Sequence, residues 1–283
     1  TDDELREDVN TIRDHGMEVI FKLNVRSRDR QWKGMMVPEN DDWDTLFDSY
    51  RDFVMHYKDL VKELNIPIYC IATEQNSMML PNWRGFGVPN PDERWRKIID
   101  EVKADPDFHS KLTISTDFNQ AGNLENMNLI TYWDALDLIS FEPYAGLTGP
   151  HVGNEYSDDP SIDELRQGFR SILENYIEPL VARTGLDVYV SEMGWQFHDG
   201  QNYDPTRVLN LANYDETDLQ EAGDIYAVVL EEFRNRPWFL GFVYWNTEDI
   251  LTDGAIGFKD RVDKPLFNYW YKVPELMMKA NLR

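Results

Sequence analysis

Six short apolar runs, separated from one another by stretches of helical periodicity, constrain the fold of this chain most strongly. The runs that predict strands cover residues 17–25, 66–74, 111–117, 136–142, 186–192 and 239–247. The helical patterns cover residues 2–15, 43–64, 92–104, 125–134, 161–184, 216–235 and 266–281. Strands that alternate with helices are typical of a parallel sheet with helices outside it. No glycine-rich phosphate loop follows any run, so a (β/α) barrel is favoured over a dinucleotide-binding sheet.

The length of the chain fits one such domain. Its 283 residues are 42% hydrophobic, which is enough to bury a full core. Barrels of this type commonly reach this length, so we expect residues 1–283 to form a single barrel domain. The only cysteine, Cys70, lies inside an apolar run and is expected to be a buried thiol without a catalytic role.

Two of the predicted strands end in a glutamate. Glu74 follows the run Ile-Tyr-Cys-Ile-Ala-Thr, and Glu192 follows Val-Tyr-Val-Ser. Because the carboxyl ends of barrel strands meet at one face, the pattern predicts a two-carboxylate active site. The alternative is that one or both glutamates form structural ion pairs. Other acidic residues near strand ends are rival candidates: Asp117, Glu142, Glu248 and Asp249.

The charge balance excludes several kinds of partner. The chain has 52 acidic and 28 basic residues and a net charge of −24, so neither nucleic acid nor an anionic membrane is an expected partner. No run approaches the roughly 20 apolar residues that span a bilayer. So large an acidic excess also suits a saline environment, where screening removes the self-repulsion. No signal peptide is visible, but the chain begins at Thr1 without a methionine, so secretion remains open.

The histidines do not predict a metal site. The sequence has five, and no two have the spacing of metal ligands. Only His198 follows a strand that ends in one of the two glutamates. We therefore expect no metal and no other cofactor.

Several short motifs occur in an order that resembles a known family. They are Lys22, Trp32-Lys33-Gly34, Thr73-Glu74, Pro81-Asn82-Trp83-Arg84, Trp133-Asp134, Asp137-Leu138-Ile139, Tyr144, Ser191-Glu192-Met193-Gly194 and Gly241-Phe242-Val243-Tyr244-Trp245-Asn246. Together they span nearly the whole chain. This series resembles the family 113 β-mannanases, which are retaining glycoside hydrolases with a (β/α)8 barrel. The resemblance implies that Glu74 ends strand four and Glu192 ends strand seven. The six strands are then strands three to eight, and strands one and two are expected before Thr1.

The resemblance also implies a reaction. A β-linked hexose polysaccharide, mannan first, is expected to be cleaved by double displacement, with Glu192 as nucleophile and Glu74 as acid and then base. Retention requires carboxyl groups about 5–5.5 Å apart. The alternative is a non-catalytic carbohydrate-binding barrel or an inactive remnant, because any substrate-binding residue of strands one and two is missing from this chain.

Other residues are assigned to the substrate by the same resemblance. Trp245 is expected to form a platform under the sugar, although a core position on its apolar strand is an alternative. Tyr144 is expected to hydrogen-bond the carboxylate of Glu192. Thr73 stands where much of the superfamily has an asparagine that binds the sugar 2-hydroxyl. The remaining candidates for sugar-binding subsites are Lys22, Asn24, Trp32, Trp83 and Trp195.

Overall fold

The chain has an α/β fold built on a six-stranded sheet. A computed structural model describes residues 1–26, 32–118, 126–195, 199–205 and 218–244. The strands lie in the sheet in the order in which they occur in the chain. They are β1 (Ile20–Lys22), β2 (Ile68–Thr73), β3 (Lys111–Asp117), β4 (Ile139–Glu142), β5 (Val188–Met193) and β6 (Phe239–Tyr244). β1 pairs parallel with β2, β2 with β3, and β5 with β6.

The chain divides into two compact units. The first unit consists of Thr1–Asp117 and Asn126–Phe141, and the second of Phe118–Glu125 and Glu142–Arg283. Each unit alternates strands with helices, as the sequence predicts.

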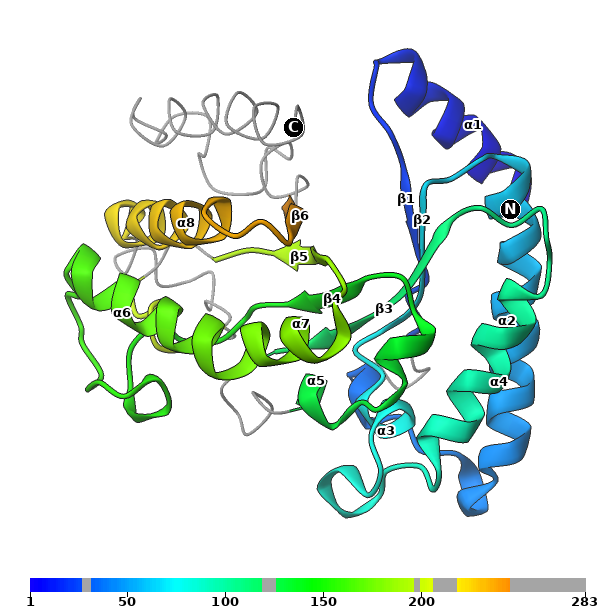
Figure 1. Ribbon diagram of the computed structural model, residues 1–283, viewed down its shortest axis with the longest axis horizontal. Helices are drawn as coiled ribbons and strands as arrows, with labels where there is room; N and C mark the ends of the chain where they lie inside the picture. Colours follow the sequence, from blue (N-terminus) through cyan, green and yellow to red (C-terminus); the bar gives the residue numbers. More distant parts are fainter. Residues whose placement is uncertain (27–31, 119–125, 196–198, 206–217, 245–283) are drawn as a thin grey trace, which may run out of the picture. The chain divides into compact units, whose positions relative to one another are not determined.

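Three amphipathic helices accompany the strands of the first unit: α1 (Asp2–Asp14), α2 (Trp43–Glu63) and α4 (Pro91–Lys103). α2 and α4 pack against each other (Figure 1). α2 is fixed to β2 by two buried tyrosines. The Tyr50 hydroxyl donates to the Ile71 carbonyl at 2.6 Å, and the Tyr69 hydroxyl donates to the Val54 carbonyl at 2.8 Å. Burial raises the pKa of both phenols far above the ordinary tyrosine value, so both remain neutral donors.

Short helical turns fill the connections of the first unit. They are η1 (Lys33–Met35), η2 (Glu39–Asp41), α3 (Asn76–Met79), η3 (Trp83–Gly85), α5 (Asn126–Leu129) and η4 (Tyr132–Ala135). The predicted helix at 125–134 is therefore two separate turns. In the stretch after β2, residues 75–80 are buried.

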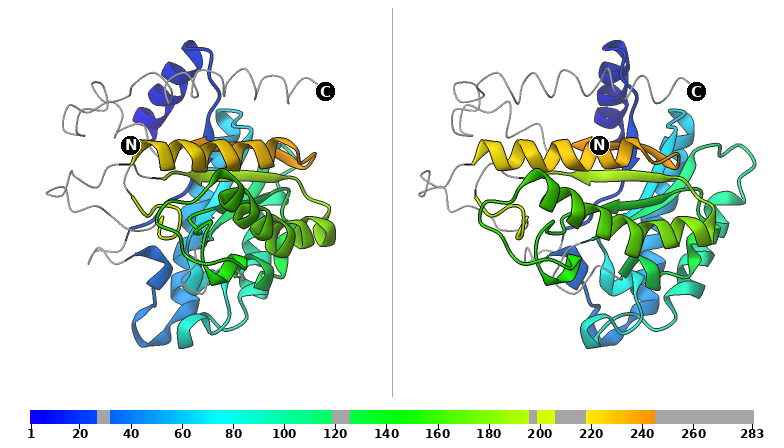
Figure 2. Two further views of the ribbon diagram at one scale, coloured as in Figure 1. Left: turned by 90° about the vertical axis from the view of Figure 1, so that its left-hand side faces the viewer. Right: turned by 60° about the vertical axis from the view of Figure 1, so that its left-hand side comes forward.

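Among its described residues, the second unit contains one long helical segment and one further α-helix. The segment consists of α6 (Ile162–Ile172), a π-helical turn η6 (Leu173–Ile177) and α7 (Glu178–Thr184). Pro179 lies in the first turn of α7. Since proline cannot donate the backbone hydrogen bond of a regular helix, it accounts for the irregular turn just before it. α8 (Leu219–Arg234) packs against α6 (Figure 2), and η5 (Pro150–Val152) lies in the connection before α6.

The strands differ from the predictions mainly at their ends. The strand predicted at 17–25 extends only over β1, and the first residues of the run 136–142 precede β4. Residues 245–247 and the predicted helix 266–281 lie outside the described residues. The six-strand order fits part of a (β/α) barrel. The numbering of the strands as three to eight, and the single domain, remain predictions.

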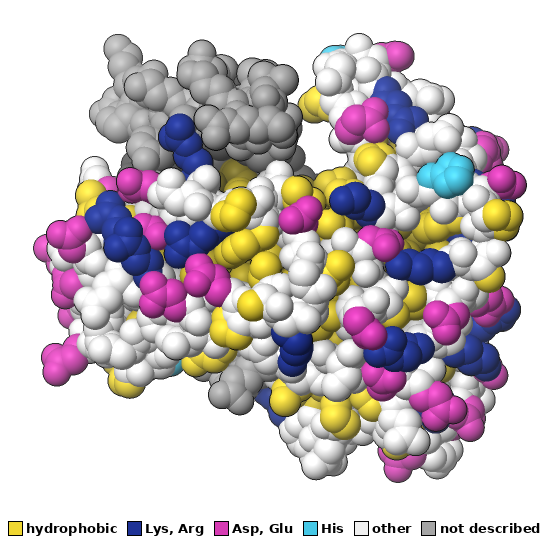
Figure 3. Space-filling view, in the orientation of Figure 1, with side chains coloured by type: hydrophobic (Ala, Val, Ile, Leu, Met, Phe, Trp, Pro, Cys, Tyr) yellow, Lys and Arg dark blue, Asp and Glu magenta, His cyan; other side chains and the backbone are white. Residues whose placement is uncertain are grey.

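The acidic excess is visible on the surface. On the face in Figure 3, Asp and Glu side chains are scattered among Lys and Arg side chains. Several pair across elements, such as Arg6 with Glu63 and Arg236 with Glu178. In the part of the chain that the structure describes, no helix has the length and apolar character needed to cross a membrane.

Candidate active site

Glu74 is the first residue after β2 and is held by two donors. Its backbone has a left-handed φ of 52°, and its N–H donates to the Ser115 carbonyl on β3 at 2.8 Å. The side chain is 14% exposed. Its Oε2 atom accepts a hydrogen bond from Trp32 Nε1 at 2.9 Å and forms an ion pair with Lys33 Nζ, also at 2.9 Å.

The Trp32-Lys33-Gly34 motif forms this contact because of its glycine. Gly34 lies under the Trp32 ring, and a Cβ atom there would lie 2.5 Å from ring carbons. Any larger residue would displace the indole from Glu74. On its other side, Trp32 packs edge-to-face against Trp83 with ring centroids 5.7 Å apart. The motif thus delivers one indole N–H and one ammonium group to the same carboxylate oxygen.

The residues beside Glu74 are buried. Thr73 is fully buried, and its hydroxyl donates to the Leu23 carbonyl at 2.8 Å. This contact uses the only proton of the hydroxyl within the fold, which leaves Thr73 no proton to donate to a sugar. Asp117, at the end of β3, is also buried and accepts a hydrogen bond from the Asn76 amide. Asp117 therefore holds the turn that follows Glu74.

Glu192 lies in the second unit, one residue before the end of β5. It is 9% exposed. The Tyr144 hydroxyl donates to Glu192 Oε1 at 2.8 Å, in the contact that the resemblance implies. This hydrogen bond fixes the orientation of the Glu192 carboxylate. The contact is in the structure, whereas the catalytic role of either residue remains a prediction.

Glu142, the rival carboxylate at the end of β4, is fully buried. The Ser191 hydroxyl approaches its Oε1 at 3.4 Å. Its backbone carbonyl accepts hydrogen bonds from Phe118 N at 3.0 Å and Tyr144 N at 2.9 Å. These backbone contacts fix the turn that carries Tyr144.

The remaining candidates for sugar-binding subsites differ in how exposed their side chains are. Trp195 is 2% exposed and packs edge-to-face on Tyr226 at 5.1 Å, so its ring belongs to the core of the second unit. Trp83 is 6% exposed, with the Arg84 guanidinium 4.7 Å from its ring centroid. Lys22 is half-buried at the end of β1, and Asn24 is exposed. Four of the residues considered lie outside the described residues: Trp245, His198, Glu248 and Asp249.

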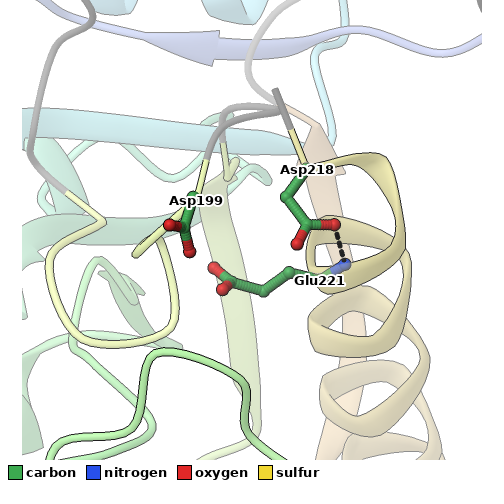
Figure 4. Close-up of side chains that lie close together, drawn as sticks. All are labelled: Asp199, Asp218 and Glu221. Carbon is green, nitrogen blue, oxygen red and sulfur yellow. Dashed lines mark hydrogen bonds between the residues drawn. The ribbon is translucent and has the colours of Figure 1, made fainter. Parts of the chain in front are cut away.

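An acidic cluster in the second unit escaped the sequence analysis. Asp199, Asp218 and Glu221 place their ligand atoms within 4.8 Å of one another (Figure 4). The Glu221 carboxylate accepts hydrogen bonds from Asn202 N at 2.9 Å, Asn202 Nδ2 at 3.0 Å and Gly200 N at 3.4 Å. Asp218 accepts from Glu221 N at 2.9 Å and caps α8. Three carboxylates could hold a cation, but two of them already organise the chain.

The sequence contained only a weak signal for this cluster. Asp218 and Glu221 have the spacing of a helix N-cap and its third residue, which marks a helix start. The part played by Asn202 depends on a contact that no local pattern reveals. Similarly, Lys33 was part of a motif, but its ion pair with Glu74 joins two segments distant in the chain.

Comparison with known proteins shows which family the chain resembles. No curated protein matches the chain. A solved complex of a family 113 β-1,4-mannanase is 24% identical, with a TM-score of 0.62, over 88% of this chain and 72% of that one. Another structure of a family 113 β-1,4-mannanase is 25% identical, with a TM-score of 0.61, over the same shares. The β-mannanase AaManA from Alicyclobacillus acidocaldarius, in complex with ManMIm, is 20% identical, with a TM-score of 0.64, over 87% and 67%.

The fold is one that glycoside hydrolases share. The model of Glycoside Hydrolase Family 113 matches residues 1–261, so the chain belongs to that family. The resemblance seen in the sequence is therefore confirmed, and the substrate class is carbohydrate.

Proposed function

We propose that the chain is a retaining β-mannanase in which Glu192 is the nucleophile and Glu74 the acid/base. The observation that carries the proposal is the hydrogen bond from the Tyr144 hydroxyl to Glu192 Oε1 at 2.8 Å. A nucleophilic carboxylate must be held in position for attack, and this donor fixes one of its oxygens. Mannan is the proposed substrate because the solved family members with similar folds are described as β-mannanases.

In the first step, Glu192 attacks the anomeric carbon while Glu74 protonates the oxygen of the leaving sugar. A covalent glycosyl-enzyme results. In the second step, Glu74 takes a proton from water, and the water oxygen displaces Glu192 from the sugar.

The surroundings of Glu74 suit this change of role. Lys33 and Trp32 both approach Oε2, so a proton on Oε1 is compatible with both contacts. When that proton has been given to the leaving group, the ammonium of Lys33 stabilises the carboxylate that remains. This is the form needed to deprotonate water in the second step.

The test measures reducing-sugar release from a panel of β-linked hexose polysaccharides by the intact chain. We expect β-mannan to be cleaved with retention of anomeric configuration. NMR of the first product measures that configuration. Glu192→Ala should lower the rate by at least about a thousandfold because no covalent intermediate can form. Added azide should restore turnover with inversion. The control is Glu39→Gln, which changes an exposed carboxylate on η2. Equal release by Glu192→Ala and the wild type would refute the nucleophile assignment.

A further inference from the structure

Tyr156 is an exposed tyrosine in the second unit, in one of two loops that hydrogen bonds join. Tyr156 is 62% exposed and lies in the connection between β4 and α6. Tyr203 lies in the segment that follows β5. The two rings pack edge-to-face, with centroids 5.9 Å apart and an interplanar angle of 74°. Tyr203 thus supports the ring of Tyr156, although much of the Tyr156 side chain remains in contact with solvent.

Each of these rings also lies against a glycine. A Cβ atom on Gly149 would come within 2.6 Å of the Tyr156 ring, and one on Gly200 within 2.7 Å of the Tyr203 hydroxyl. Both glycines have a positive φ, 125° and 85° respectively, which disfavours other residues. The close approach therefore depends on glycine at both positions.

A buried asparagine joins the two loops. The backbone N–H groups of Leu147 and Thr148 donate to the Asn202 carbonyl at 2.6 and 3.1 Å. The Thr148 hydroxyl donates to Asn202 Oδ1 at 2.6 Å. Asn202 Nδ2 donates to the Ser157 carbonyl at 3.1 Å, next to Tyr156, and also to Glu221. The described parts of the two loops are therefore joined before a ligand binds, which lowers the entropic cost of binding.

The position of the loops points to the substrate. They follow β4 and β5, so they belong to the end of the strands where barrel enzymes bind their substrates. Tyr144 and Glu192 lie at the same ends of these two strands. A large aromatic side chain is costly to leave exposed, but its flat face fits the C–H face of a pyranose ring.

We infer that Tyr156, supported by Tyr203, forms an additional subsite that stacks against one hexose of the β-linked substrate, away from the bond that is cleaved. The inference rests on the proposed function. A neutral sugar is the expected ligand because the residues next to Tyr156 in the chain include three exposed carboxylates, Glu155, Asp158 and Asp159. These groups can accept hydrogen bonds from sugar hydroxyls. They would repel a second copy of a chain whose net charge is −24.

The test compares long and short substrates. Binding of mannohexaose and mannotriose is measured by calorimetry in an intact Glu192→Gln background, which prevents turnover. We expect Tyr156→Ala to weaken mannohexaose binding about tenfold and to leave mannotriose binding unchanged. Tyr156→Phe should bind like the parent because the ring remains. Met17→Ala removes an equally exposed apolar side chain, 56% exposed, ahead of β1 and should change neither affinity.

The same substitution is then tested in the active chain. Tyr156→Ala should raise KM for mannohexaose with little change in kcat, and its melting temperature should equal that of the wild type. If Tyr156→Ala bound mannohexaose with unchanged affinity and KM while the wild type cleaved mannan, only the subsite would be overturned. If Tyr156→Ala weakened the binding of both oligosaccharides equally, the placement of Tyr156 in a subsite away from the cleaved bond would be overturned. Absence of both cleavage and binding would overturn the subsite together with the proposed function.

Discussion

Glu74, the proposed acid/base, is paired with the ammonium group of Lys33. The two side chains are 13% and 14% exposed, and their charged atoms are 2.9 Å apart. At this degree of burial the attraction is screened far less than in a surface pair. The ion pair should therefore help to decide over which pH range Glu74 carries its proton. The strands beside β2 contribute two further charged groups near their ends, Lys22 on β1 and Asp117 on β3.

Replacing this lysine should move the pH profile of the reaction. Without the ammonium of Lys33, the ionised form of Glu74 is less favourable, so the protonated acid persists to higher pH. We expect Lys33→Met to shift the alkaline limb of kcat/KM upward and to lower kcat, because the second step loses its stabilised base. The measurement is the pH dependence of mannan or aryl-mannoside hydrolysis.

The control is Lys103→Met, which breaks a more exposed ion pair with Asp137 in the same unit. It should leave the pH profile as it is. An alkaline limb that stays in place or moves downward in Lys33→Met would contradict the role given to Lys33.

Glu221 is a second residue whose charge the fold disfavours. Burial raises the pKa of its carboxyl above the ordinary glutamate value, even though hydrogen bonds from Asn202 and Gly200 act in the opposite direction. The folded state therefore binds this proton more tightly than the unfolded state. Stability from this group is fully present below the ordinary pKa and is lost as the pH rises through the raised one.

Glu221→Gln should remove that part of the pH dependence. We expect the free energy of unfolding of the wild type to fall across the range just above the ordinary glutamate pKa, and the variant to show a flatter curve there. Urea unfolding at a series of pH values measures the difference. Asp224→Asn, on the same helix, is the control for loss of one acidic group. Parallel curves for wild type and Glu221→Gln would show that this carboxyl does not contribute.

At the scale of elements, α6 is fixed by a glycine in its interior. A Cβ atom on Gly168 would lie 1.7 Å from the Leu147 carbonyl oxygen, so the helix packs directly on the backbone of the loop before it. The same loop continues to Tyr156 and is tied to Asn202. In the sequence, Gly168 only interrupts an otherwise good helical pattern. The close approach of α6 to the Leu147 carbonyl explains why a glycine stands there.

Gly168→Ala should therefore destabilise the protein although alanine is the better helix former. Overpacking of this kind costs about 1–3 kcal/mol, and the backbone contact places the change at the upper end of that range. Gln167→Ala, at the exposed neighbouring position, should change stability by less than about 0.5 kcal/mol. Urea unfolding measures both variants. A Gly168→Ala variant as stable as the wild type would mean that the loop moves freely away from α6.

Over the whole molecule, charge is the dominant feature. A net charge of −24 produces self-repulsion that dissolved salt screens. We expect the melting temperature to rise as sodium chloride is increased from low to molar concentration. Sucrose at matched osmolality, which does not screen charge, is the comparison. A melting temperature that does not rise with salt would contradict the adaptation to saline conditions inferred from composition.

The predictions from sequence were most accurate where the signal is local. Periodic apolar spacing located β3 at both of its ends and α2 to within one residue, because side-chain burial repeats along each element. Local patterns were poorest at β1, where a long apolar run forms a strand of only three residues. Pairing with β2 ends there, and the length of a ladder depends on the neighbouring strand as much as on the run itself.

The sequence by itself determined the alternation of strands and helices, the acidic surface and the placement of Glu74 and Glu192 near the ends of their strands. Each follows from the order and spacing of residues along the chain. Only the tertiary structure decided which side chains meet these carboxylates. The ion pair of Lys33 with Glu74, the hydroxyl of Thr73 turned to the Leu23 carbonyl and the loops joined by Asn202 all link segments about 40 residues or more apart. Such contacts depend on how elements pack, and that information is not contained in any one stretch of sequence.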